Sequence, residues 1–142
     1  MRKFIQIGML AATLLASSFH FARADDSVYQ AFGGTPGLTK IVDDFVNTVL
    51  ADPRIKGFFT QADIPNLKMR LVEQFCQLTG GPCTYGGLDM TTAHKGMGVK
   101  DANFNALAED LQFAMDRAGI PFRTQNYLVS QLASMEKQIT YK

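Results

Sequence analysis

The 142-residue chain contains no tryptophan, only two cysteines and few signals for β-strands. No alternating run of apolar and polar residues reaches a useful length, so a fold based on sheets is not expected. Positive and negative charges nearly balance, with 14 basic and 13 acidic residues, which leaves no electrostatic footprint for nucleic acid or an anionic bilayer. What remains is a moderately hydrophobic chain long enough for a single core.

The first 24 residues have the layout of a secretory signal. A short basic start precedes an uncharged apolar run over residues 4–21, and Ala22-Arg23-Ala24 supplies the small-x-small pattern of a signal peptidase site. A retained membrane anchor is the alternative, because the apolar run is near the lower length for a span. We predict an exported, periplasmic protein in which residues 1–24 are removed and residues 25–142 form one domain.

Cleavage at this site would change both the charge and the histidine content. It removes Arg2, Lys3 and Arg23 but no acidic residue, so 11 basic residues would face 13 acidic ones and the formal charge would be about −2. It also removes His20. His94 would then be the single histidine of the mature chain.

The two cysteines, Cys76 and Cys83, flank the turn Gly80-Gly81-Pro82. In an oxidising compartment such a pair is compatible with a disulfide, and two reduced, partly buried thiols are equally compatible. Two cysteines at this spacing with one distant histidine are a poor zinc pattern, so metal binding by these thiols is not expected.

Helical periodicity dominates the rest of the chain. Asp52-Pro53 ends the first long amphipathic pattern because proline restricts the preceding residue and donates no helical hydrogen bond. Gly80-Gly81 ends the next one. The pattern predicts an all-α domain with helices over about 27–32, 36–52, 63–79, 89–95, 101–119 and 124–139.

His94 lies between two long apolar helical faces. A lone imidazole in such a place is compatible with a ligand of haem iron and also with a packed or surface histidine that has no function. The two faces, each at helical spacing, consist of Leu67, Leu71, Phe75 and Leu78 before the histidine, and of Phe104, Leu107, Leu111 and Met115 after it.

Several short motifs, in this order and spacing, together resemble a known family. They are Gly33-Gly34, Val42-Asp43-Asp44-Phe45, Val49-Leu50-Ala51-Asp52-Pro53, Phe58-Phe59, Gly80-Gly81 and Ala93-His94-Lys95-Gly96-Met97-Gly98-Val99. From about Val28 to about Ile139 the chain resembles a group I truncated haemoglobin. The resemblance implies a truncated globin, a two-over-two helical sandwich in which helices B and E cross helices G and H with haem b between them.

The resemblance also implies roles for individual residues. His94 would be the proximal ligand of the haem iron, and Phe59 would pack on the haem after helix B. Lys68 and Arg70 are placed to reach the haem propionates, although a solvated helix face explains them equally well. The other implied haem contacts, each of which ordinary core packing would also explain, are Phe45, Leu67, Leu71, Phe75, Met90, Val99, Phe104 and Leu107.

The chain departs from the family pattern on the distal side of the haem. Group I members usually have a tyrosine after the helix-B phenylalanine and often a glutamine on helix E. Here the distal ligand pocket would be formed by Val46, Leu67 and Leu71, none of which donates a hydrogen bond. Losing that bond to dioxygen should cost about 1–3 kcal/mol, roughly tenfold to a hundredfold in affinity. We therefore predict weak or fast-dissociating dioxygen binding; slow escape would point to another donor, such as Gln74.

These features favour a binding protein for oxygen, carbon monoxide or nitric oxide over an enzyme. The alternatives are a haem enzyme that detoxifies nitric oxide or peroxide, and a periplasmic haem carrier or electron-transfer protein. Peroxide cleavage normally requires a distal acid–base residue, and attachment of a c-type haem requires Cys-x-x-Cys-His, which is absent. The predicted partners are the gas and an unidentified reductase. We expect no nucleic acid, no membrane after cleavage, and a monomer or weak homo-oligomer.

Overall fold

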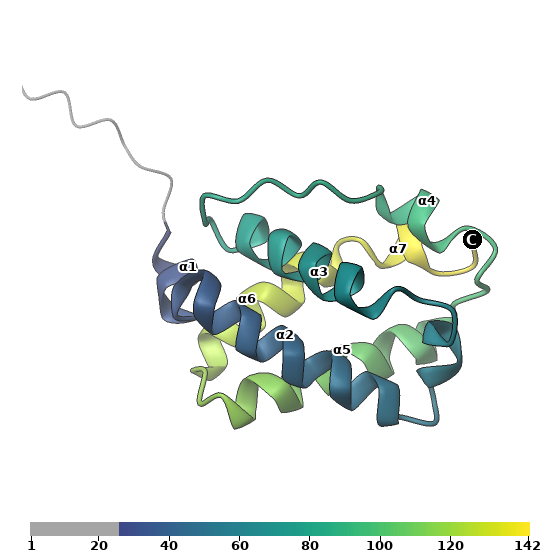
Figure 1. Ribbon diagram of the computed structural model, residues 1–142, viewed down its shortest axis with the longest axis horizontal. Helices are drawn as coiled ribbons and strands as arrows, with labels where there is room; N and C mark the ends of the chain where they lie inside the picture. Colours follow the sequence, from purple (N-terminus) through teal and green to yellow (C-terminus); the bar gives the residue numbers. More distant parts are fainter. Residues whose placement is uncertain (1–25) are drawn as a thin grey trace, which may run out of the picture.

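The computed structural model describes residues 26–142, so the predicted signal segment lies outside the described residues and its cleavage stays a prediction. Within this range every regular element is helical, which confirms the all-α prediction (Figure 1). No helix in residues 26–142 is long and apolar enough to cross a membrane. The elements are α1 (Ser27–Ala31), α2 (Gly34–Ala51), the 3-10 helix η1 (Lys56–Phe59), α3 (Ile64–Leu78), α4 (Met90–His94), α5 (Asp101–Arg117), α6 (Phe122–Ala133) and α7 (Glu136–Ile139).

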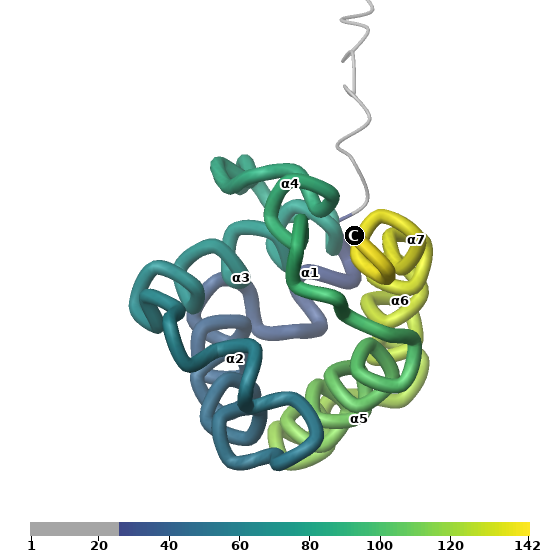
Figure 2. Tube along the Cα trace, turned by 90° about the vertical axis from the view of Figure 1, so that its right-hand side faces the viewer, coloured from purple at the N-terminus to yellow at the C-terminus, as the bar shows by residue number. Residues whose placement is uncertain are grey.

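The long helices form two layers. Figure 2 shows α2 and α3 on one side of the molecule and α5 and α6 on the other, with α4 and α7 next to each other across one end. Helix α2 packs against α3 within its own layer and against α5 of the other layer, so it also forms the contact between the two layers. This is the predicted two-over-two arrangement.

Helix α2 follows from its sequence. Its inward side chains recur at the three- and four-residue spacing of one helical face, and all of them are buried. The turn before it needs glycine, because Gly33 has a φ of 81°. Glycine is also required at position 37, where a Cβ would lie 1.9 Å from the carbonyl oxygen of Phe32. The buried face consists of Leu38, Ile41, Val42, Phe45, Val46 and Val49.

The core lies between α1, α2, α3, α5 and α6. Phe32, Phe75, Leu111, Met115 and Leu128 are almost completely buried there. By contrast, neither α4 nor α7 contains a buried residue. These two short helices thus lie beyond the core.

The last predicted helix differs from the structure. The sequence predicts one helix over 124–139, but α6 ends at Ala133 and α7 begins at Glu136. The break has a tertiary cause, since the end of the chain turns back to the segment after α4. There the N–H of Tyr141 donates to the carbonyl of Val99 at 2.8 Å, and Gly98 donates to the carbonyl of Lys142 at 3.4 Å.

The loop between α3 and α4 runs back along α3. A disulfide joins Cys76 to Cys83, so of the two alternatives that the sequence left open the structure contains the bridge. The Gln77 side chain accepts the N–H of Tyr85 at 2.6 Å, and the Glu73 carboxylate accepts the N–H of Gly86 at 3.1 Å. This loop leads directly into α4 and therefore determines where the helix that carries His94 begins.

Candidate functional site

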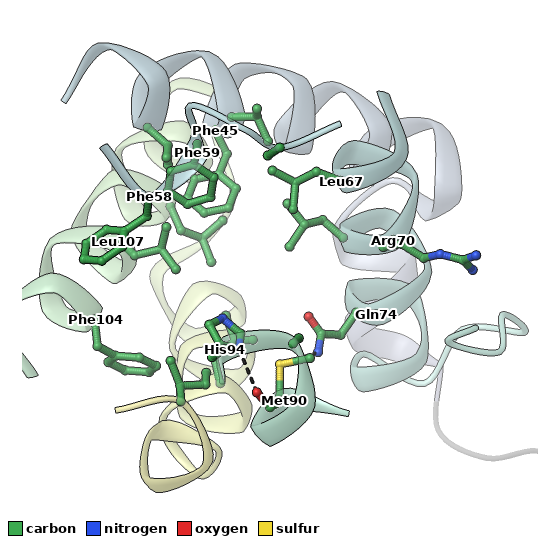
Figure 3. A pocket seen from close by; sticks show the side chains of 18 of the residues that line it. Phe45, Phe58, Phe59, Leu67, Arg70, Gln74, Met90, His94, Phe104 and Leu107 are labelled. Carbon is green, nitrogen blue, oxygen red and sulfur yellow. Dashed lines mark hydrogen bonds between the residues drawn. The ribbon is translucent and has the colours of Figure 1, made fainter. Parts of the chain in front are cut away.

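A cavity of about 490 Å³ lies between the α2–α3 layer and the α4–α7 end of the molecule (Figure 3). Its volume is within the range of roughly 300–1,000 Å³ that is typical of small-molecule and cofactor sites. Most of its lining is aliphatic or aromatic and comes from α2, η1, α3, α4, α5, α6 and α7. Such a space suits a large, flat, apolar group.

His94 is the last residue of α4 and lines this cavity. Its Nδ1 lies 2.8 Å from the carbonyl oxygen of Met90. Because a carbonyl only accepts, Nδ1 must carry the proton, and in the neutral ring Nε2 is then an unprotonated acceptor. Figure 3 shows the imidazole at the cavity wall beside Met90.

The start of α4 is fixed by a side-chain cap. Asp89 accepts hydrogen bonds from the backbone N–H of Thr92 at 2.9 Å and from its hydroxyl at 2.6 Å. These bonds favour the carboxylate and lower the pKa of Asp89 below its ordinary value. The cap therefore orients the one-and-a-half turns that carry His94.

The wall contributed by α2 and α3 offers no hydrogen bond at the predicted distal positions. Val46, Leu67 and Leu71 all line the cavity. Next to them the rings of Phe45 and Phe75 pack in a tilted arrangement, with centroids 6.3 Å apart. At the three distal positions the cavity wall is apolar, as the sequence predicts.

Most residues predicted to contact the cofactor meet at the cavity. These are Phe45, Phe59, Leu67, Leu71, Phe75, Met90, His94, Phe104 and Leu107. Lys68 and Val99 are not brought into it. The ammonium of Lys68 pairs with Asp43 of α2, and Val99 is buried beside the chain end, where its carbonyl accepts the N–H of Tyr141.

Arg70 lies at the edge of the cavity instead of Lys68. Its stem contributes to the lining, while Figure 3 shows its guanidinium directed outwards. There Nη1 donates to Glu73 at 2.9 Å. The hydrogen bond from the Gly86 N–H and the one from Arg70 both lower the pKa of Glu73. A cation held at the rim is suitably placed for an acidic substituent on the bound group.

Three further polar residues line the cavity, namely Gln61, Gln74 and Tyr85. Of these, Gln74 alone was named from the sequence, as a possible alternative donor to dioxygen. The hydroxyl of Tyr85 donates to the carbonyl of Leu88 at 2.8 Å, and burial raises the pKa of Tyr85. Gln74 did have a signal, because it lies seven residues after Leu67 and three after Leu71, on the same helical face.

A two-over-two helical fold with one imidazole facing a largely apolar cavity defines a haem-binding globin of the shortened type. The chain belongs to the bacterial-like globins, whose family model matches residues 27–141, and within them to the group 1 truncated haemoglobins. The family binds haem, which confirms the predicted cofactor. The imidazole of His94, the apolar walls and the cation at the rim all fit that group.

Individual relatives agree with this assignment. The chain is 34% identical over 113 residues to a group 1 truncated haemoglobin of Mycolicibacterium paratuberculosis, covering 80% of this chain and 83% of that protein. The Fe(III) crystal structure of truncated haemoglobin from Tetrahymena pyriformis matches with a TM-score of 0.78 and 30% identity, covering 81% of this chain and 98% of the other. Haemoglobin from Chloroflexus aurantiacus matches with a TM-score of 0.69 and 25% identity, over 81% and 98% of the two chains.

Proposed function

We propose that this protein reversibly binds a small diatomic gas at a haem held by His94. The observation that carries the proposal is the 2.8 Å contact between His94 Nδ1 and the Met90 carbonyl, which leaves Nε2 as the free nitrogen of a cavity-facing imidazole. His94 is also the single histidine in residues 26–142. When bound, haem would supply the iron that binds the gas molecule, and His94 would be the residue that holds this iron.

Several residues of the chain would hold the haem and orient its ligand His94. The Met90 carbonyl fixes the tautomer and the ring orientation of His94, as the outer partners of metal-ligating histidines generally do. The aromatic side chains of Phe45, Phe59 and Phe104 pack around the cavity and keep water out. Arg70 at the rim is the cation placed for the haem propionates.

Val46, Leu67 and Leu71 would leave a gas molecule without a hydrogen bond. Dioxygen gains more from such a bond than carbon monoxide or nitric oxide does. Its absence should weaken dioxygen binding by about 1–3 kcal/mol, roughly tenfold to a hundredfold. The same three side chains supply no acid or base, and this favours a binding role over detoxification of peroxide.

An absorption spectrum of residues 25–142 loaded with haem tests the proposal. It would be recorded in ferric, ferrous and carbon monoxide forms for the wild type, His94→Ala and the control Lys95→Ala, which changes an exposed neighbour. We expect a Soret band that shifts with carbon monoxide in the wild type and the control, and that is lost or altered in His94→Ala. Absence of haem uptake by the wild type, or a His94→Ala spectrum equal to that of the wild type, would contradict the proposal.

The alternative functions, a haem enzyme and a haem carrier, can be distinguished with the same haem-loaded protein. Nitric oxide consumption by the dioxygen-loaded protein would favour an enzyme, and rapid haem transfer to an apo-acceptor would favour a carrier. Stable haem with reversible carbon monoxide binding and negligible turnover is the result that we expect. Export and a reductase partner remain predictions from the sequence.

A further inference from the structure

Gln74 is a buried amide on the cavity face of α3, next to the aliphatic side chains of that face. It is 9% exposed and lines the cavity together with Leu67 and Leu71. An amide in such surroundings costs stability unless it is hydrogen-bonded. The hydrogen-bond partner of this amide therefore indicates what Gln74 does in the fold.

That partner lies across the cavity wall on α4. Gln74 Nε2 donates to the sulfur of Met90 at 3.6 Å, while the Met90 carbonyl accepts from His94 Nδ1 at 2.8 Å. Met90 is thus held by α3 through its side chain and holds the imidazole through its backbone. In residues 26–142 no other hydrogen bond joins α3 to α4.

Helix α4 depends on such external contacts. It has five residues, none of them buried, and a helix of this length is not stable alone. It packs against α7 on one side. Figure 3 shows Gln74 reaching it from the other side, with the amide nitrogen at Met90 and the carbonyl turned into the cavity.

We infer that Gln74 is a positioning residue for His94, acting through Met90 across the cavity from α3 to α4. The inference rests on the proposed role of His94 as the haem ligand. Val46, Leu67 and Leu71 offer no hydrogen bond on the distal side, so the orientation of the His94 imidazole would be the point at which this hydrogen-bonded chain acts on gas binding. A fixed imidazole orientation is then what Gln74 contributes.

The test uses the haem-loaded mature chain and two readouts, the iron–histidine stretching band of the ferrous form and the rate of haem loss to an apo-acceptor. The variants are Gln74→Leu, Met90→Leu and the double variant, with the unbranched Gln74→Met as a second replacement should leucine prevent folding. Met90→Leu removes the sulfur acceptor but keeps the backbone carbonyl that binds His94. Met69→Leu, on the exposed side of α3, is the matched control.

We expect Gln74→Leu and Met90→Leu each to shift and broaden the stretching band and to speed haem loss roughly 3-fold to 10-fold. The double variant should be no worse than either single one, because both remove the same contact. Met69→Leu should behave as the wild type.

An unchanged stretching band in the Gln74 variants would overturn the inference, even if gas release changed, because Gln74 would then act on the gas and not on His94. Additive effects in the double variant would overturn it as well. His94→Ala separates this failure from that of the proposed function. If His94→Ala keeps the wild-type band, the proposed function fails; if it loses the band while Gln74→Leu keeps it, only the inference fails.

Discussion

Replacing Asp110 with asparagine should stabilise the protein above pH 7 and lose that advantage in acid. Asp110 is 3% exposed in α5, and its Oδ2 has no hydrogen-bond partner. Its Oδ1 lies 3.7 Å from Nη2 of Arg54, but that guanidinium is already bound by Asp52 at 2.7 Å and by Glu109 at 2.6 Å. Burial, followed by the charge of Asp52, raises the pKa of Asp110 to about 6.

The direction of the pH dependence follows from this pKa. The ordinary value is 3.8, so between about pH 4 and pH 6 the folded state binds more protons at Asp110 than the unfolded state does. The free energy of unfolding contributed by this group therefore falls as the pH rises through that window. At about 1.4 kcal/mol per pH unit, the charged form costs at most about 3 kcal/mol at pH 8. Asparagine does not ionise and avoids this cost.

Urea unfolding of the haem-loaded wild type and Asp110→Asn at pH 4 and pH 8 measures the effect. The pKa of Asp52 is lowered by its hydrogen bonds with Arg54, so its contribution is present above about pH 4 and is lost in acid. Comparing the two proteins at each pH largely cancels that opposite trend. Asp101→Asn, an exposed site on the same helix, controls for the amide itself. A difference between wild type and Asp110→Asn that is equal at the two pH values would refute the reasoning.

Three further outcomes are expected. Val46→Tyr should slow dioxygen release roughly tenfold to a hundredfold in flash photolysis, because it restores a distal donor; an unchanged rate would mean that a donor already exists. Replacing Cys76 and Cys83 together with alanine should lower the free energy of urea unfolding by about 2–3 kcal/mol, and an equally stable variant would contradict a folded-state bridge. Arg70→Ala should speed haem loss while Lys68→Ala leaves it unchanged, since Lys68 pairs with Asp43; the reverse order would place the propionates elsewhere.

Much of the fold was predictable because local signals agree with the tertiary structure. Asp63 caps α3 through a 3.2 Å bond from the N–H of Asn66, as its place before a proline-containing first turn predicts. Asp52 ends α2 in an extended conformation before Pro53. In both cases the residue that determines the boundary lies within a few positions of it.

The break between α6 and α7 was not predictable in the same way. Neither glycine nor proline lies between Ala133 and Glu136. The chain turns there because its end pairs with Gly98 and Val99, which are some forty residues earlier in the sequence. Helical periodicity carries no information about such a distant partner.

The polar residues of the cavity show a similar division. Arg70 lies three residues after Leu67, so helical geometry places it on the cavity face. Lys68 directly follows Leu67 and is turned about 100° away from it around the helix axis. Spacing alone therefore predicts that Arg70, and not Lys68, reaches the cavity. The position of Gln74 on that face was available too, but its partner Met90 follows a loop whose path is fixed by the disulfide and by two side-chain bonds from α3.

The distribution of these groups bears on how the site would discriminate among gases. The α2 and α3 positions opposite His94 are aliphatic, whereas Gln74 and the Met90 carbonyl both lie on the side of the imidazole. A hydrogen bond on the gas side would favour the most polar ligand, but one on the imidazole side acts on every ligand through the same nitrogen. Under the proposed function, a pocket built in this way would set overall affinity at α4 and leave selectivity to the aliphatic wall, which would give dioxygen no advantage over carbon monoxide or nitric oxide.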